Sequence, residues 1–446
     1  MAFIWPNGIE CFMSGSGALH RADATGEIAV ACKFHAVQFS SAALHIECEF
    51  PSLDVNKPSI LWAMLNSSEF RLVGQTESGK PIVAERVHYA GDFLTRPGQR
   101  PSNVVGFRAR SIDVVNVEGE SAKRRFRIVN FAPEEQFDFA FQRKDIGLRL
   151  HPVDDYEAKI PTLGIRDPFA VTAIAEVSGG DESNSIAFLD SLCELLSYAR
   201  GTRVQWISYE DVGPNNEILR THFGSRITRR LTPMDLIPDA LTFAFIEDTF
   251  DAYVDFREEF PHRKLLGLYL DACDQTDFID VRAIKIVVLM EAVKAMVLEK
   301  DPLLPRFSNK TKAIKFKKEM RHAIRDVAQR LDLSGDTIEG LLRMSDGCHH
   351  HTFRECITAI QRYLHIDVDP ADVSIFVGAR NKLIHEATFL HLANPAKSYP
   401  FANHAEEYFW LVGFIDRFVL RLIGYRGPYI DRTNGGSADL VSAEPE

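Results

Sequence analysis

The feature that most constrains the fold is a change in the spacing of apolar residues along the chain. Before about residue 150, short runs with alternating, β-branched or aromatic residues are separated by turn clusters. Between residues 277 and 424, apolar residues recur every three or four positions, as on one face of a helix. This change predicts a multidomain α+β protein in which a β-rich part precedes a helical part.

The N-terminal part is predicted to form an antiparallel sandwich or barrel. Glu77-Ser78-Gly79-Lys80-Pro81 lies between two strand-like runs and is typical of a hairpin turn. No phosphate-binding loop or other catalytic motif occurs here. We expect strands at 27–37, 42–50, 59–65, 70–74, 82–89, 104–117, 124–131 and 137–141.

The middle of the chain combines both kinds of pattern. Residues 185–200 form an amphipathic helical pattern that ends at Gly201, a residue suited to a C-cap. Two strand-like runs, 202–209 and 218–230, and two helical runs, 238–260 and 263–274, follow. The predicted domains are therefore a β-rich recognition or regulatory domain (1–150), an α+β connector (151–275), an all-α helical bundle (276–430) and a disordered Gly/Ser/acidic tail (431–446).

Composition indicates a soluble protein of the cytoplasm. The apolar content is 46% and the charged content 25%. Charged residues interrupt the longest apolar run, 283–298, and the N-terminus lacks the features of a signal peptide, so we expect no membrane segment. The seven cysteines are scattered without a CxxC pair, which predicts free thiols. A net charge of −11 argues against broad, non-specific binding of nucleic acid.

One short motif in the helical part combines three groups suited to phosphate chemistry. Pro370 and Asp372 predict a helix start, and Arg380, Asn381 and His385 follow on the same helix. Asn381 and His385 are one turn apart, and the long side chain of Arg380 can flank the same face. An imidazole exchanges protons near neutral pH, and a guanidinium binds phosphate through paired donors.

Arg380-Asn381-x-x-x-His385 resembles the signature of HEPN domains, an Arg separated by four to six residues from a His. The resemblance implies a small helical bundle that acts as a metal-independent endoribonuclease, without a cofactor, and leaves 2′,3′-cyclic phosphate ends. It also implies a homodimer in which two copies of the motif form one site. His385 would be the general acid or base, Arg380 would bind the scissile phosphate, and Asn381 would orient these groups.

Two further segments extend the resemblance. Leu289-Met290-Glu291-Ala292 resembles the first HEPN helix, in which an acidic residue interrupts an apolar run; alternatively, Glu291 is an exposed or salt-bridged helix residue. The run 195–201, followed by a strand, resembles the middle segment of single-chain anti-phage HEPN proteins of the ApeA type. That family implies a nuclease that a phage component activates through the N-terminal domain, and that halts translation by cutting tRNA or other RNA.

A basic segment precedes the motif. Residues 306–330 carry nine basic and two acidic side chains, a local charge of +7 within an acidic chain. Such a helix would attract an RNA backbone, or it would be a solvated face that pairs with acidic residues elsewhere. The predicted RNA-binding residues are Lys310, Lys312, Lys315, Lys317, Lys318, Arg321 and Arg325. The predicted buried stripe of this helix is Phe316, Met320, Ile324, Val327 and Leu331.

Cys348-His349-His350-His351 is a run of four metal-binding side chains. Consecutive residues cannot all reach one tetrahedral ion, and no partner motif accompanies them, so we predict a loop and helix start rather than a metal site. Two alternatives to the nuclease remain open. The bundle could be a non-catalytic dimerisation and binding module, or the protein could be a ligand-binding regulator whose site lies in the β-rich domain.

Overall fold

The structure is a computed structural model that describes residues 11–21, 29–38, 43–50, 69–90, 104–134, 136–159, 170–225, 234–260, 265–303, 309–346, 351–433 and 436–439. The chain divides into two compact units, residues 1–250 and 251–446. The boundaries predicted from the sequence, near 150 and 275, differ from this division. The first unit is rich in strands and the second is mainly helical, so the α+β layout is confirmed.

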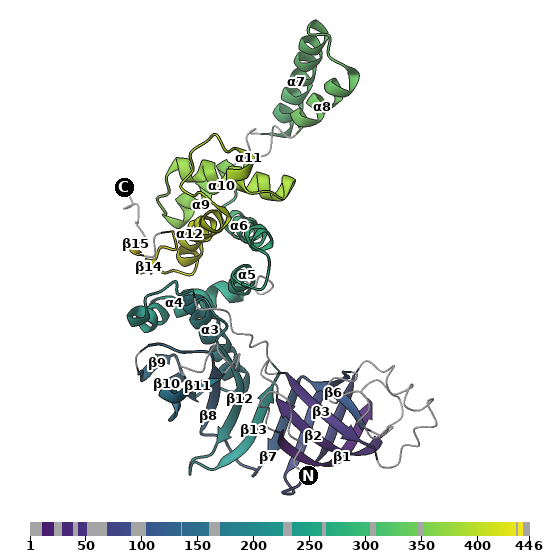
Figure 1. Ribbon diagram of the computed structural model, residues 1–446, viewed down its shortest axis with the longest axis vertical. Helices are drawn as coiled ribbons and strands as arrows, with labels where there is room; N and C mark the ends of the chain where they lie inside the picture. The colour runs from purple at the N-terminus through teal and green to yellow at the C-terminus, as the bar shows by residue number, and fades with distance from the viewer. Residues whose placement is uncertain are drawn as a thin grey trace. The chain divides into compact units, whose positions relative to one another are not determined.

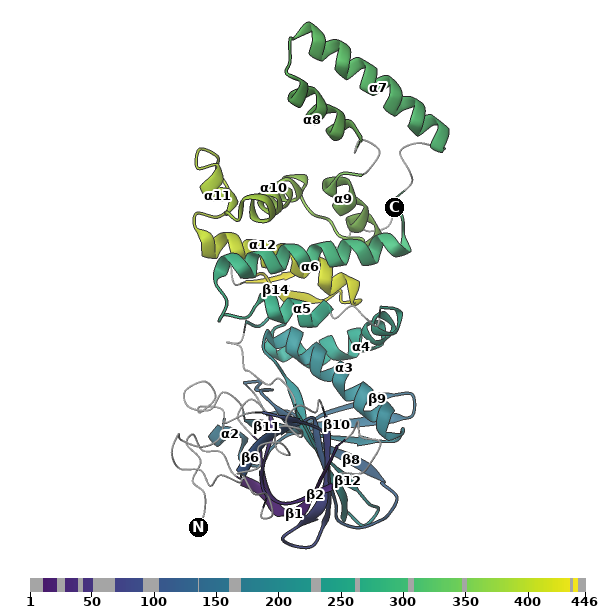
Figure 2. The same cartoon turned by 90° about the vertical axis from the view of Figure 1, so that its right-hand side faces the viewer.

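The first part of the N-terminal unit is a closed barrel of six antiparallel strands. Strand β4 pairs with β1 on one side and with β5 on the other, which closes the ring β1-β2-β3-β6-β5-β4. Figure 2 shows this ring nearly end-on. The strands are β1 (Cys11–Arg21), β2 (Ala29–Gln38), β3 (Leu44–Glu49), β4 (Phe70–Thr76), β5 (Pro81–Tyr89) and β6 (Val104–Ala109).

The core of the barrel follows from the two-residue period of its strands. Cys32, Phe34 and Ala36 alternate with more exposed neighbours on β2 and belong to one buried cluster with residues of the other strands. Where β1 crosses β4, Gly17 faces Gly74, and a Cβ on Gly17 would lie 2.5 Å from the carbonyl oxygen of Val73. Glycine is required there because the two backbones approach so closely.

The sheet does not end at the barrel. The predicted strand 104–117 is two strands, β6 and β7 (Ser111–Val115), separated by a bend at Arg110. β5 pairs with β7, and the sheet continues from there in the order β7-β13-β12-β8-β11-β10-β9 (Figure 1). The added strands are β8 (Lys123–Val129), β9 (Phe139–Arg143), β10 (Ile146–Pro152), β11 (Val171–Ser178), β12 (Gln205–Val212) and β13 (Ile218–Gly224). The strands of the predicted connector, β11, β12 and β13, are therefore part of the same sheet. The predicted strand 59–65 lies outside the described residues.

Helix α3 (Glu182–Arg200) packs on this extension of the sheet. Asp181 caps its first turn by accepting from the Asn184 amide, and Gly201 ends it with φ of 58°, as predicted. The Trp206 indole on β12 donates to Asp190 on α3 at 2.7 Å. The short helices α2 (Tyr156–Lys159) and η2 (Asp239–Leu241) and the longer α4 (Thr242–Glu259) complete this part of the chain.

The second unit contains a bundle built from α6 (Ile279–Lys300), α9 (Phe353–Leu364), α10 (Pro370–Glu386) and α12 (His404–Leu422). Its core includes a stacked pair, Phe376 of α10 and Phe414 of α12, with ring centroids 4.4 Å apart. The apolar pattern of the sequence predicts helices at about 353–364 and 401–424. Helix α9 has the first of these bounds, whereas α12 begins at His404 and ends at Leu422. The shorter helices α5 (Leu265–Ala272) and α11 (Leu390–Ala393) adjoin α6 and α10, respectively.

A helical hairpin is inserted between α6 and α9. It consists of α7 (Lys310–Arg330) and α8 (Gly335–Asp346), which pack on each other. The predicted buried stripe of α7 is wrong: Phe316, Val327 and Leu331 are 41%, 43% and 64% exposed, and Met320 and Ile324 are only half-buried. The periodic pattern did mark a helix, but one short partner helix covers only part of an apolar face.

The C-terminal segment is ordered well past the predicted boundary at 431. Strand β15 (Ser437–Asp439) pairs with β14 (Pro428–Ile430). Arg432 donates to the buried Asp416 carboxylate and to the Tyr269 hydroxyl, both at 2.8 Å. The expectation of a disordered tail is therefore wrong for these residues, because a buried ion pair holds them; residues 440–446 lie outside the described part of the chain.

Two predictions from composition can be compared with the structure. Among the described helices, none has the length and apolar character needed to cross a bilayer. Five of the seven cysteines have described side chains, and all five are buried free thiols: Cys32, Cys48, Cys193, Cys273 and Cys356.

Candidate functional site

Helix α10 carries the Arg-Asn-x-x-x-His motif and has well-defined ends. Asp369 accepts from the Ala371 amide at 2.7 Å, and Pro370 occupies the first turn, as the sequence predicts. At the other end Ala387 adopts the left-handed conformation, with φ of 49°, and its amide donates to the Lys382 carbonyl. The motif therefore occupies the last two turns of a capped helix whose apolar side packs in the bundle.

Two acceptors hold the guanidinium of Arg380. Its Nη2 donates to Glu291 Oε1 on α6 at 3.0 Å, and its Nη1 donates to Asn381 Oδ1 at 3.0 Å. The guanidinium carbon also lies 5.1 Å from the centre of the Phe353 ring on α9. Helices α6, α9 and α10 thus fix the direction of the Arg380 side chain. A guanidinium has five N–H donors, and these two hydrogen bonds use two of them.

Glu291 links Arg380 to a second cation, Lys294. Lys294 lies three residues after Glu291 on α6 and forms an ion pair with its carboxylate. The Lys294 ammonium is also 5.1 Å from the centre of the Phe353 ring. Two cations therefore share one carboxylate and one aromatic face, which leaves a net positive charge in a half-buried setting.

The sequence analysis missed Lys294 and Phe353. The i,i+3 spacing of Glu291 and Lys294 was a usable local signal. Phe353 offered none, because it meets Arg380 only after α9 and α10 pack.

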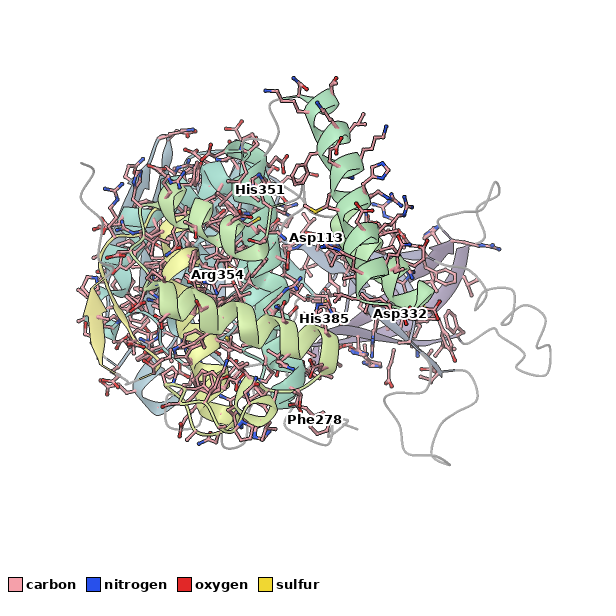
Figure 3. The ribbon with its side chains drawn as sticks, turned by 90° about the horizontal axis from the view of Figure 1, so that it is seen from above. Asp113, Phe278, Asp332, His351, Arg354 and His385 are labelled. Carbon is pink, nitrogen blue, oxygen red and sulfur yellow. The ribbon has the colours of Figure 1, made fainter. Side chains whose placement is uncertain are left out.

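His385 lies apart from this group. It is exposed near the end of α10 and makes no hydrogen bond or ion pair with the part of the chain that the structure describes. Five positions separate it from Arg380, which places the two side chains about 140° apart around the helix. Figure 3 shows His385 near one end of α10. The structure therefore brings together Arg380, Asn381 and Glu291, and leaves the imidazole open to solvent.

The predicted RNA-binding cations lie on the inserted hairpin. Lys312, Lys315, Lys318 and Arg325 of α7 are exposed, and Lys317 and Arg321 are half-buried. Lys310 begins the helix, but its side chain lies outside the described residues. Within the described chain, Lys312, Lys315 and Lys318 form no ion pair. Binding of RNA and a solvated face both stay predictions for this helix.

The histidine run before α9 is only partly described. Cys348, His349 and His350 lie outside the described residues. The Nδ1 atom of His351 lies 3.8 Å from Glu355, which also completes a capping box with Thr352 at the start of α9. Among the residues that the structure places, no group of three or more His, Cys, Asp or Glu side chains could hold a metal ion.

The N-terminal unit has a hollow of about 420 Å³ on strands β8 to β11. Its charged side chains are already paired. Lys123 lies 2.9 Å from Glu176, and Arg149 lies 2.8 Å from Asp138. Ion pairs of this kind are common on the solvent side of an antiparallel sheet, so this hollow is weaker evidence for a site than the group around Arg380.

Comparisons of this chain with protein-family models, with curated proteins and with solved structures found no match.

Proposed function

We propose that the protein is a metal-independent endoribonuclease of the HEPN type, acting on RNA in the cytoplasm. The observation that carries the proposal is the arrangement around Arg380. A half-buried carboxylate on α6 and an amide on α10 fix a guanidinium, little more than one turn before an exposed imidazole on the same helix. A fixed cation and an exposed imidazole, which can act as a general acid or base, fit phosphodiester cleavage when two copies of the helix supply them to one site.

Each residue has a distinct role in the proposed reaction. One imidazole removes the proton from a ribose 2′-hydroxyl, whose oxygen then attacks the adjacent phosphorus. The bond from phosphorus to the 5′-oxygen breaks, and that oxygen receives a proton. The products are a 2′,3′-cyclic phosphate and a 5′-hydroxyl. Arg380 stabilises the charge on the phosphoryl oxygens, Asn381 orients the guanidinium, and His385 transfers the protons.

The angular separation of Arg380 and His385 supports a homodimer. Side chains about 140° apart on one helix do not converge on one phosphorus atom. Two copies of α10 that face each other would supply an arginine from one chain and an imidazole from the other. This arrangement also provides two imidazoles, one to accept a proton and one to donate a proton.

The biological role in the proposal comes from the ApeA-type resemblance. The β-rich unit would keep the nuclease inactive until it meets a phage component, and the active enzyme would then cut tRNA or other RNA. This role is consistent with the layout of a β-rich unit followed by a helical unit. It rests on analogy of domain order rather than on contacts.

The deciding experiment compares wild type with His385→Ala on total RNA and tRNA in the presence of EDTA. The matched control is His322→Ala, which removes an exposed histidine from α7. We expect wild type and the control to produce fragments ending in 2′,3′-cyclic phosphate, and His385→Ala to produce none. Cleavage that EDTA abolishes, or that survives His385→Ala, would contradict the proposal.

Absence of cleavage by all three proteins calls for a second assay, in cells challenged with phage. Growth arrest by wild type but not by His385→Ala would indicate an enzyme that is inactive at rest. Equal growth of both strains would favour the non-catalytic module, in which the bond between Arg380 and Glu291 simply joins α6 to α10.

A further inference from the structure

A hollow of about 330 Å³ lies between α9 and the first half of α10. Its lining includes Arg354, Thr358, Arg362, Asp367, Pro370 and Val373. Figure 3 shows Arg354 beside this half of α10, with His385 near the opposite end. The hollow is thus on the helix that carries the motif, but none of the predicted site residues lines it.

Three of the lining residues form one stripe along α9. Arg354, Thr358 and Arg362 are spaced at i, i+4 and i+8, so their side chains point the same way. The two arginines are exposed and about 12 Å apart along the helix axis. Neither guanidinium forms an ion pair with any residue that the structure describes. One carboxylate, Asp367, lines the same hollow, so the lining carries an excess of positive charge.

One end of the hollow lies close in sequence to a residue that contacts Arg380. On α10, Pro370 and Val373 line it, and helical spacing continues their stripe through Val377 to the position between Arg380 and Asn381. On α9, Arg354 directly follows Phe353, whose ring lies against the Arg380 guanidinium. The Arg354 end of the hollow is therefore the end nearer to Arg380, and Arg362 lies at the other end.

We propose that this hollow, a groove between α9 and α10, binds the backbone of single-stranded RNA next to the scissile phosphate. Arg354 and Arg362 would each bind a phosphate, since a guanidinium offers paired donors in a geometry that matches phosphate oxygens. The Thr358 hydroxyl, between them, donates to the Arg354 carbonyl at 3.2 Å, so its oxygen can accept from a ribose hydroxyl. The apolar floor at Val368 and Val373 suits a sugar or a base. The inference rests on the proposed function, because it assigns the path of the substrate of that site.

The test measures binding, separately from cleavage. The probe is a short, fluorescently labelled 2′-O-methyl RNA strand, which lacks the 2′-hydroxyl that the reaction requires. Full-length wild type, Arg354→Gln, Arg362→Gln and the double variant are titrated at several salt concentrations. The control is Arg426→Gln, which removes an exposed arginine outside α9 and α10.

We expect the double variant to bind about tenfold more weakly than wild type, and the control to bind like wild type. The slope of log affinity against log salt should fall by about 0.7 for each phosphate that the variant no longer neutralises, hence by about 1.4 for the double variant. An unchanged salt slope in the double variant, or an equal drop in affinity in Arg426→Gln, would overturn the proposal that the groove binds RNA.

The binding assay and the cleavage assay separate the two proposals. Weaker binding by the groove variants, together with no RNA cleavage by wild type and equal growth of the phage-challenged wild-type and His385→Ala strains, would support the RNA-binding groove and contradict the nuclease proposal. Cleavage that depends on His385, together with unchanged RNA binding by the groove variants, would support the nuclease proposal and contradict the RNA-binding groove. Absence of any binding of the probe by wild type would overturn the proposal that the groove binds RNA.

Discussion

Glu291→Gln is the substitution that most directly tests how the candidate site is built. The Glu291 carboxylate accepts from Arg380 at 3.0 Å and also pairs with Lys294. Glutamine keeps the shape of the side chain but removes its charge. Two neighbouring cations over the Phe353 ring would then have no carboxylate between them. We expect lower stability of the α6–α10 contact and a less well fixed Arg380.

The size of the effect follows from burial. The side chains of Glu291 and Arg380 are 30% and 23% exposed, so the pair is neither fully solvated nor fully buried. A hydrogen bond to a charged group contributes about 1.5–3 kcal/mol, and partial exposure reduces this value. We therefore expect Glu291→Gln to lower the free energy of unfolding of the helical unit by about 1.5 kcal/mol. A double-mutant cycle with Arg380→Gln should show a coupling energy of about 1 kcal/mol.

Hydrogen exchange of α6 and α10 amides during urea titration would measure these free energies, because it reports on the helical unit alone. The matched control is Glu386→Gln, which breaks the exposed i,i+4 pair with Lys382 and should cost no more than about 0.5 kcal/mol. A coupling energy between Glu291 and Arg380 as small as that of the control pair would refute the reasoning. In the cleavage assay, Glu291→Gln should lower activity, since a misdirected guanidinium stabilises less charge in the transition state.

Four further predictions concern stability. Burial, together with the nearby Arg108, lowers the pKa of His45 in the barrel to about 4, so unfolded chains bind its proton more readily. Acidification from about pH 6.5 to about pH 4 should therefore lower the free energy of unfolding of wild type by about 3 kcal/mol. Urea unfolding at a series of pH values should show a smaller decrease in His45→Gln. Gly201→Ala should destabilise the protein by about 2 kcal/mol, because φ is 58° and the new Cβ would lie 2.3 Å from the Met234 carbonyl oxygen. Ala387→Gly should stabilise α10 by about 1 kcal/mol, because Ala387 adopts the left-handed conformation. Thermal unfolding should show a lower melting temperature for the first variant and a higher one for the second. Arg432→Met should cost about 3–5 kcal/mol in urea unfolding by leaving Asp416 buried and unpaired, and a decrease below about 1 kcal/mol would show that the C-terminal segment contributes little.

Local patterns in the sequence were enough to predict many of the elements. The caps of α3 and α10 depend on residues within a few positions of each helix end. The end of α3 at Gly201 and the start of α10 at Pro370 lie where the pattern predicts. The hairpin of β4 and β5 was likewise readable from its turn residues. Strands β1, β10 and β11 were missed. β1 contains glycines at positions where β4 approaches closely, and such a requirement is invisible before the strands pair.

The sequence by itself determined the order of β-rich and helical parts, the helix that carries Arg380, Asn381 and His385, and the basic character of α7, because periodicity, caps and charge are local properties. Tertiary structure alone decided that six strands close into a barrel and that β8 to β13 extend its sheet. It also decided that Arg380 turns toward Glu291 and Phe353, while His385 stays exposed. Those contacts join residues tens of positions apart, and chain packing, rather than any short pattern, brings such residues together.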